Sequence, residues 1–303
     1  LGSTQLAELG ELETPILLTC TLCIWQAGDA LAQHMLALPG NGDVRSINPV
    51  VGETNDGTLN DTRVRPGIAD AVRRALSVAD TGAVAEGSVG AAHGTVMFGW
   101  KGGIGTSSRV LPPTLGGYTI GVIVQGNYGG VLQISGVPIG QLLGQYSFSR
   151  DVAGDAARKN PGGGTPNTER GDGSCMIVIA TDAPMLDRNL KRLAARAVLA
   201  LGRTGSSASN GSGDYVIAFS TAKSARRSST LRTLTLEDVG NETTSALFQA
   251  ATEATEEALY NALFMATSVS TRRTTVNALP LDTVRALLRA RGIAGTAASA
   301  AKK

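Results

Sequence analysis

The residues best suited to chemistry lie at the junction Gly171-Asp172-Gly173-Ser174-Cys175, where a glycine-rich polar run meets an apolar run. The apolar run, from Cys175 to Thr181, has the pattern of a buried strand, so Ser174 stands where a flexible segment enters a sheet. A cut of the Gly173–Ser174 peptide bond would leave Ser174 with both a hydroxyl and a free α-amine. The pKa of an α-amine is roughly 7.7–8.0, close to what a general base needs at neutral pH. One residue would then supply a nucleophile and its base, whereas the plain alternative is a loop that leads into a core strand.

Ser212 and Asp214 form a second pair with chemical potential, just before a strand predicted over Tyr215–Thr221. They are two residues apart, so in an extended segment their side chains point to the same side. A hydroxyl and a carboxylate on one side could position and polarise a nucleophile. The alternative is a turn that Asp214 caps.

Two further polar segments could complete a site. Asn127 follows a predicted strand, and its amide could donate a hydrogen bond to a developing oxyanion, unless it is simply a turn asparagine. Glu53 and Asn55 lie in a polar run, residues 52–61, which is either an acidic binding loop or a hydrated turn. The spacing of its acidic groups lacks the pattern and closing glutamate of an EF-hand calcium loop.

The composition excludes several classes of function. Hydrophobic residues make up 42% of the 303 positions and charged residues 17%, which is typical of a globular protein. The net charge is only +2, so nothing indicates a nucleic-acid partner. No apolar run is long enough to span a bilayer. With only two histidines, His34 and His93, a histidine-rich metal site is not expected, and we predict no metal and no cofactor.

The three cysteines do not make a disulfide framework, which favours a reducing compartment. Cys20 and Cys23 have the C-x-x-C spacing inside an apolar run, Pro15–Trp25, which predicts a buried strand. We interpret them as buried structural thiols, with a redox pair or a zinc site as the alternatives. The expected compartment is the cytoplasm, with the periplasm left open.

Strands and helices that could position these groups follow from periodicity and turn residues. The expected strands are nearly continuously apolar, which suits sheets covered on both faces. Either a four-layer αββα sandwich or a three-layer α/β fold satisfies this pattern. Besides those already named, the predicted strands are Thr95–Trp100, Gly105–Leu111 and Tyr118–Gln125, and the predicted helices are Asp29–Leu38, Val64–Ala79, Asp187–Leu201, Thr243–Ala266 and Leu281–Arg291.

Residues 151–173 interrupt the pattern of strands and helices. Their centre, Asn160 to Asn167, is rich in glycine and proline and has no apolar surface to bury. We therefore expect a single domain, 1–303, with a flexible tether at 151–173 directly before Ser174.

Taken in order, the runs at 52–61, 124–129, 171–184 and 210–215 resemble the DmpA-type self-processing aminopeptidases, which include D-aminopeptidases and β-peptidyl aminopeptidases. The resemblance extends from about residue 15 to about residue 280. It implies a four-layer αββα sandwich like that of N-terminal-nucleophile hydrolases, with different connectivity. It also implies a chain that cuts itself into an α chain (1–173) and a β chain (174–303), assembled as a homotetramer of αβ units.

The resemblance further implies a role for each candidate residue. Ser174 matches the nucleophile, Ser212 and Asp214 its hydrogen-bonding supports, and Asn127 an oxyanion donor. Glu53 matches the acidic residue near the amino group of the substrate. Asn55 departs from the family, which commonly has Tyr or Trp at that position, so an aromatic wall of the pocket is missing.

We therefore predict a serine aminopeptidase or amidase that acts on peptides, amino-acid amides or esters through an acyl-enzyme on Ser174. Three alternatives remain open at this point. Cys175 could be the nucleophile after a cut one residue later, since a thiol is intrinsically the better nucleophile. The chain could be an uncut binding or scaffold protein of the same fold, or an acyltransferase that passes the acyl group to an amine.

Overall fold

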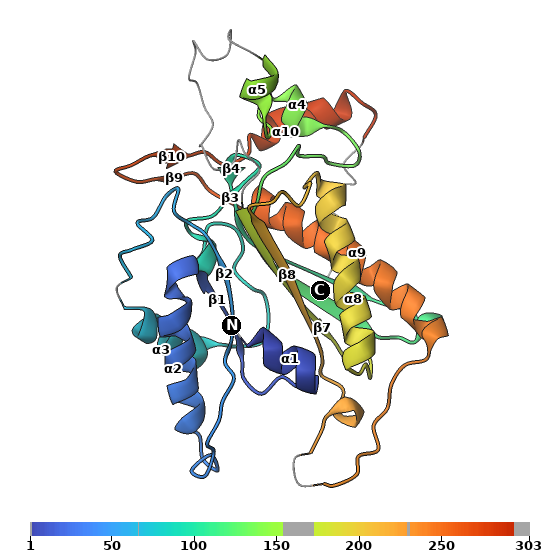
Figure 1. The fold of residues 1–303 in the computed structure, drawn as a ribbon. Coiled ribbons are helices and arrows are strands. Elements are labelled where there is room, and N and C mark those ends of the chain that lie inside the picture. Colours follow the sequence, from blue (N-terminus) through green and yellow to red (C-terminus); the bar gives the residue numbers. More distant parts are fainter. Residues whose placement is uncertain (1, 66, 154–172, 229–230, 294–303) are drawn as a thin grey trace.

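The protein is built of four stacked layers, in the order helices, strands, strands and helices (Figure 1). The structure is a computed structural model, and it describes residues 2–65, 67–153, 173–228 and 231–293. The first two layers pack through a small apolar cluster around Ala27, Val51 and Val72. Their elements are the helices α2 (Ile24–Leu36) and α3 (Ile68–Val78) and the parallel strands β1 (Ile16–Cys20) and β2 (Val50–Thr54).

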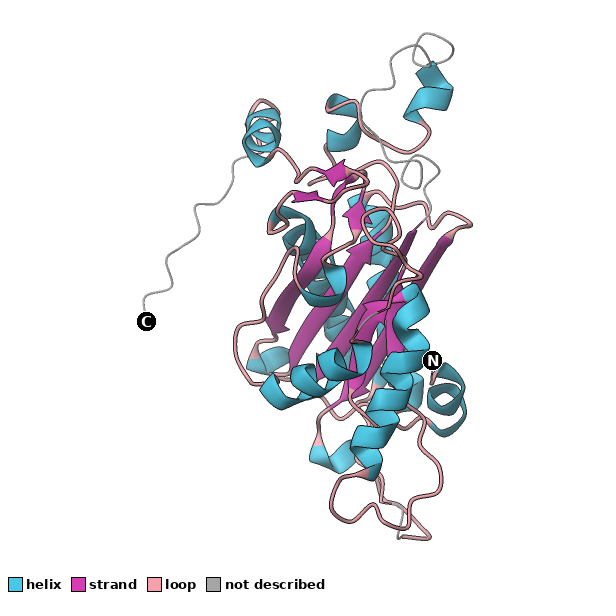
Figure 2. Ribbon diagram, turned by 90° about the vertical axis from the view of Figure 1, so that its left-hand side faces the viewer, coloured by secondary structure: helices cyan, strands magenta, loops and turns pink. Residues whose placement is uncertain are grey.

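The third layer is a four-stranded sheet, whose strands run side by side in Figure 2. Its strands, in spatial order, are β5 (Gly103–Val110), β6 (Thr119–Asn127), β7 (Gly173–Thr181) and β8 (Ser212–Ser220). β7 pairs antiparallel with β6 on one side and parallel with β8 on the other. One face of β7 lies against β2, so the two strand layers meet directly at the strand predicted to carry the chemistry.

The fourth layer is formed by α8 (Asp187–Thr204) and α9 (Asn241–Phe264), which bury the other face of the sheet in the main hydrophobic core. The helix α9 comes so close to β5 that a Cβ on Gly105 would lie 1.9 Å from the Ala258 carbonyl oxygen. Small residues on both elements therefore allow backbone to pack on backbone, which the high glycine content of the sequence permits. This arrangement confirms the four-layer αββα prediction.

Shorter elements complete the described part of the chain. Two hairpins, with α4, α5 and α10, gather at one end of the sheet, at the top of Figures 1 and 2. The bounds of all the shorter elements, wherever they lie, are α1 (Ser3–Leu9), β3 (Val96–Met97), β4 (Trp100–Lys101), α4 (Ile139–Leu142), α5 (Ser149–Ala153), β9 (Val269–Ser270), β10 (Thr275–Val276) and α10 (Leu281–Arg289), with 3-10 turns at Thr21–Cys23, Gly90–Ala92, Pro113–Leu115 and Lys223–Ala225.

Several predicted boundaries were wrong. The apolar run Pro15–Trp25 is not one strand, because β1 ends at Cys20, a 3-10 turn follows, and α2 begins at Ile24. The run predicted as a strand over Thr95–Trp100 is instead a tight hairpin, in which Phe98 and Gly99 both have positive φ. An apolar run alone does not distinguish strand from buried helix or hairpin.

Both ends of the predicted tether lie in regular elements instead. Residues 151–153 belong to α5, and Gly173 is already the first residue of β7. The rest of the predicted tether, residues 154–172, lies outside the described residues. The proposed cut therefore falls within the first two residues of a strand rather than at the end of a loop.

Candidate active site

Ser174 is the second residue of β7, and its neighbours are fixed by the sheet register. It pairs with Asn127 of β6 and with Gly213 of β8, and it is 8% exposed. Gly173 has no room for a side chain, because an added Cβ would lie 2.2 Å from the Asn127 carbonyl oxygen. The strand thus holds the Gly173–Ser174 peptide tightly against the end of β6.

Asn127 has an amide whose orientation is determined by two hydrogen bonds. Its Oδ1 accepts a hydrogen bond from the Val96 backbone N–H at 2.8 Å, and its Nδ2 donates to the Asn55 carbonyl oxygen at 2.9 Å. Because Val96 engages the oxygen, the nitrogen is directed toward Asn55, and no hydrogen bond within the described part of the chain engages its second N–H. Asn127 and Ser174 are direct cross-strand partners, so this donor lies beside the nucleophile candidate.

Lys101 supports this arrangement, and no pattern in the sequence identified it. Its side chain is completely buried, and Nζ donates hydrogen bonds to the carbonyl oxygens of Ala92 at 2.8 Å and Gly102 at 2.7 Å. Burial lowers the pKa of Lys101 to about 7. The same segment fixes the Thr95–Val96 peptide, whose carbonyl accepts from the Gly102 N–H at 3.0 Å and whose N–H holds Asn127.

Ser212 and Asp214 form the predicted pair, with Ser212 Oγ donating to Asp214 Oδ1 at 2.9 Å. They pair in register with Gly173 and Cys175, whereas Ser174 pairs with Gly213. Because side chains alternate along a strand, Ser212 and Asp214 lie on the opposite face from the Ser174 hydroxyl. The prediction that they share one side is confirmed, but in the uncut chain they approach the backbone of β7 rather than the hydroxyl.

The Asp214 carboxylate lies beside the backbone of β7 at Cys175. Burial raises its pKa, against the lowering effects of the hydrogen bonds from Ser212 and from the Cys175 backbone. Its Oδ2 is buried and has no hydrogen-bond partner among the described residues. A positive charge at the start of β7 would therefore give this oxygen a partner.

Cys175 faces the helical core and is fully buried. Burial raises the pKa of its thiol well above the usual value, and the Asp214 carboxylate adds to this effect. Since the thiolate is the nucleophilic form, this environment opposes the alternative in which Cys175 attacks.

Glu53 and Asn55 lie at the end of β2, where the sequence predicted a loop or turn. Glu53 is half-buried, and its Oε2 accepts a hydrogen bond from Thr21 Oγ1. Asn55 is exposed and contributes its backbone carbonyl to Asn127, while its side-chain Oδ1 accepts from the Gly57 N–H at 3.0 Å. The two strand layers thus bring Glu53, Asn55, Asn127 and Ser174 to one end of the molecule.

The chain is similar to known peptidases over most of its length. The model of peptidase family S58 matches residues 1–277. The chain belongs to peptidase family S58. Beta-peptidyl aminopeptidase BapA from Sphingosinicella microcystinivorans is 40% identical over 295 residues, which cover 95% of this chain and 72% of the relative. The protein of the same name from Sphingosinicella xenopeptidilytica is 37% identical over 296 residues, with 96% and 72% covered.

Solved structures of similar proteins show the same fold. The Burkholderia sp. beta-aminopeptidase has a TM-score of 0.80 at 38% identity, covering 94% of this chain and 76% of that one. The l-aminopeptidase d-ala-esterase/amidase from Ochrobactrum anthropi, described as a new variant of the Ntn hydrolase fold, has a TM-score of 0.78 at 36% identity, with 92% and 74% covered. The PH0078 protein from Pyrococcus horikoshii OT3 has a TM-score of 0.82 at 37% identity, with 96% and 76% covered. The S58 chain is therefore a hydrolase with serine aminopeptidase/amidase function.

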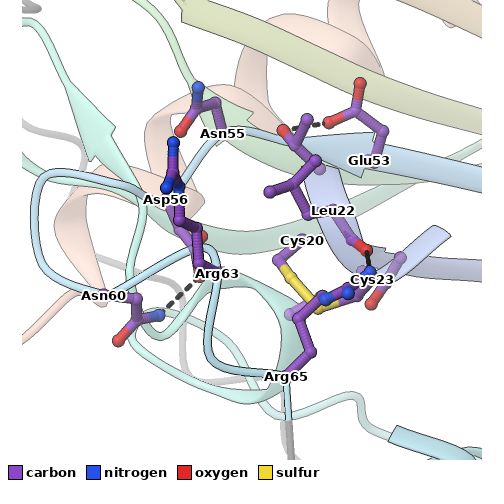
Figure 3. Close-up of a disulfide and its surroundings, with 12 residues drawn as sticks. Cys20, Leu22, Cys23, Glu53, Asn55, Asp56, Asn60, Arg63 and Arg65 are labelled. Carbon is purple, nitrogen blue, oxygen red and sulfur yellow. Dashed lines mark hydrogen bonds between the residues drawn. A yellow bond between two sulfur atoms is a disulfide. The ribbon is translucent and has the colours of Figure 1, made fainter. Parts of the chain in front are cut away.

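The cysteines of this S58 chain correct a prediction. Cys20 and Cys23 are not free thiols, because a disulfide joins them in the structure (Figure 3). The 3-10 turn after β1 brings their Cα atoms to 5.1 Å, within the range that a disulfide spans. The cysteines therefore no longer favour a reducing compartment, because that expectation depended on their being unpaired.

A cavity of about 950 Å³, lined by both apolar and charged side chains, runs along β2 and β8 of the S58 chain toward α1 and α8. Met176, Tyr215 and Phe219 are among its lining residues, and Glu53 reaches it, but Ser174 does not line it. Its size alone therefore does not make it the place where a substrate reacts.

Two negative observations concern the described residues only. None of their helices has the length and apolar character needed to cross a membrane. They also contain no group of three or more His, Cys, Asp or Glu side chains arranged to hold a metal ion.

Proposed function

We propose that this S58 chain cuts itself between Gly173 and Ser174 and that Ser174, as a new N-terminal residue, is the nucleophile of the aminopeptidase/amidase reaction. The observation that carries the proposal is the cross-strand pair Asn127–Ser174, in which the Asn127 amide is held with its nitrogen available as a donor. Position 173 also supports the site of the cut, because an added Cβ would clash with the backbone of Asn127 and only glycine fits there.

The cut would begin with attack of Ser174 Oγ on the carbonyl carbon of Gly173. The C–N bond then breaks, and Gly173 becomes an ester on the Ser174 oxygen while the α-amine of Ser174 is released. Water hydrolyses the ester and leaves a carboxylate on Gly173 and a free hydroxyl on Ser174. The α chain (1–173) and β chain (174–303) result from this step.

The freed α-amine of Ser174 would interact with side chains of β8. Protonated, it lies beside the Ser212–Asp214 pair, whose Oδ2 is buried without a partner among the described residues. Neutral, it is the base that accepts the proton of Ser174 Oγ when the hydroxyl attacks a substrate. On this proposal, Ser212 and Asp214 act on the amine of Ser174 from the edge of the sheet, and the hydroxyl faces the substrate on the other side.

The substrate reaction would follow the same route. Ser174 Oγ attacks the carbonyl carbon of the substrate, and Asn127 donates to the oxyanion. The bond to the leaving amine or alcohol then breaks, and the leaving group takes the proton that the α-amine, now an ammonium group, received from Ser174. Water then releases the acyl group from Ser174. We propose that Glu53 binds the ammonium group of peptides, amino-acid amides or esters, which restricts the reaction to the N-terminal residue.

We also propose a homotetramer of αβ units as the working assembly. Of the two compartments considered, the oxidising periplasm would preserve the Cys20–Cys23 disulfide, whereas the cytoplasm would expose it to reduction.

The test compares Ser174→Ala with Ser77→Ala, a matched loss of a hydroxyl on the exposed face of α3. The first variant should give one uncut chain without activity, and the second should be cut and active like the wild type. Splitting of purified Ser174→Ala into two chains would refute the proposal. N-terminal sequencing of the smaller wild-type chain should begin at Ser174; a sequence beginning at Cys175 would assign the reaction to the thiol instead.

A further inference from the structure

We propose that Thr21, held in place by the Cys20–Cys23 disulfide, is a positioning residue for the Glu53 carboxylate and thereby sets the affinity for the ammonium group of the substrate. This inference rests on the proposed role of Glu53 and adds to it a structural control that depends on the redox state of the cysteine pair.

Thr21 lies just beyond the point where the first two strands are anchored. In the parallel pair β1–β2, Thr19 lies opposite Glu53 and Cys20 lies opposite Thr54. Gln125 ties both strand ends to the main sheet, because its Nε2 donates to Thr54 Oγ1 at 2.8 Å and to the Thr19 carbonyl oxygen at 3.2 Å. The chain is therefore fixed up to Cys20, and Thr21 is the first residue beyond that anchor.

Thr21 contacts Glu53 directly. Its Oγ1 donates to Glu53 Oε2, and among the described residues no other hydrogen bond reaches this carboxylate. One oxygen is thus held by the hydroxyl of Thr21, and Oε1 is left for a cation. Figure 3 shows a dashed hydrogen bond that ends on the Glu53 carboxylate, with the Cys20–Cys23 disulfide in the same view.

The segment that carries Thr21 is intrinsically weak. It is a single 3-10 turn, Thr21–Cys23, without a hydrogen bond from a side chain at its N-cap. Short 3-10 turns have poorer hydrogen-bond geometry than α-helices and need support from elsewhere. Leu22, in the middle of the turn, is exposed, and its carbonyl oxygen accepts a hydrogen bond at 3.0 Å from Nη1 of Arg65, an exposed residue.

The disulfide supplies the missing support. It joins the last residue of β1 to the last residue of the turn, so Thr21 sits inside a closed loop of four residues. A dithiol reductant would donate two electrons and two protons, giving two thiols and the cyclic disulfide of the reductant. The loop would then open, and Thr21 would no longer be held against Glu53.

The experiment measures the hydrolysis of two compounds by the purified full-length chain. The first is the amino-acid p-nitroanilide that the wild type hydrolyses fastest, and the second is p-nitrophenyl acetate, which has no ammonium group. For the p-nitroanilide, Thr21→Val should raise KM about tenfold with little change in kcat, as expected for one lost hydrogen bond to a charged group. Hydrolysis of p-nitrophenyl acetate should be unchanged. Thr21→Ser, which keeps the hydroxyl, should restore the wild-type KM.

Reduction should reproduce the effect without a mutation. Dithiothreitol should raise the KM of the wild type for the p-nitroanilide several-fold, and should add little to Thr21→Val because both act on the same contact. Alkylation of the folded chain should then label the half-buried Cys20 but not the buried Cys175. The double variant Cys20→Ser/Cys23→Ser should have the raised KM without any reductant, and dithiothreitol should not change it further.

Three results would overturn the inference, and they are distinguishable. If Glu53→Gln raises KM for the p-nitroanilide but Thr21→Val and the reductant do not, the role of Glu53 stands and the positioning role falls. If Thr21→Val lowers the turnover of both substrates alike, Thr21 has only a structural role. If Glu53→Gln leaves KM unchanged, the proposed ammonium site itself is wrong, and this inference falls with it.

Discussion

The buried Lys101 should make the stability of the protein depend on pH in a way that one substitution removes. In the folded chain, burial lowers the pKa of Lys101 from 10.5 to about 7. The unfolded chain therefore binds more protons than the folded chain between about pH 7 and pH 10.5. Stability rises with pH wherever the unfolded state binds more protons. The free energy of unfolding therefore increases through that window, because the cost of deprotonating the lysine on folding falls as the pH rises.

The magnitude follows from the size of the pKa difference. Each unit of difference corresponds to about 1.4 kcal/mol, so the whole effect is on the order of 5 kcal/mol, of which about 2 kcal/mol falls between about pH 7 and pH 9. The Lys101 side chain is buried, so its charge is poorly solvated in the folded chain. Lys101→Met keeps an unbranched side chain that is one atom shorter and removes the titrating group, although it leaves the carbonyls of Ala92 and Gly102 without their donor.

The assay is urea unfolding of the chain with and without the Lys101→Met substitution, at about pH 7, 8 and 9. A Ser174→Ala background keeps every sample as the same uncut chain. Other titrating groups are shared, so the difference in unfolding free energy between the two chains isolates the lysine. That difference should shift by about 2 kcal/mol in favour of the lysine-containing chain from about pH 7 to pH 9. Parallel curves, with a shift below about 0.5 kcal/mol, would refute the reasoning.

Three further predictions concern the candidate site. Asn127→Ala should lower kcat about 10²- to 10³-fold with a smaller effect on KM, because an oxyanion donor acts in the transition state; steady-state kinetics of the cut enzyme would show this, and an unchanged kcat would contradict it. Gly173→Ala should slow self-cutting severely, since the new Cβ would lie 2.2 Å from the Asn127 carbonyl oxygen and 2.5 Å from Tyr128 Cα; a time course on denaturing gels is the measurement, and cutting at the wild-type rate would show that β7 does not hold this peptide as described. Cys175→Ala should still be cut and keep its activity, because the thiol faces the helical core; an active-site titration in which the variant is uncut and inactive would return the nucleophile role to Cys175.

Local signals in the sequence predicted most of the strands and helices, whereas the four-layer order came from the resemblance to a family, because periodicity left a three-layer fold open. The apolar runs that became β6 and β7 are unambiguous, and Asn127 and Ser174 stand at their ends. Ser212 and Asp214 were placed on one side from their spacing alone, which the structure bears out. Which face of the sheet that side would be depends on the register between β7 and β8, and no local pattern encodes it.

The features that the sequence did not reveal are tertiary. Lys101 looks like any surface lysine until the hairpin β3–β4 buries it against the main-chain carbonyls. The C-x-x-C spacing of Cys20 and Cys23 is compatible with thiols, a metal site or a disulfide, and only the turn after β1 decides between them. Glu53 was expected in a loop because β2 has few apolar residues and is defined by its pairing with β1.

The intact mass of a freshly purified, fully active preparation tests the proposed self-cutting most directly. We expect two polypeptides, one ending at Gly173 and the other beginning at Ser174, with activity rising in step with their appearance. A single unbroken chain with full turnover would contradict the proposal.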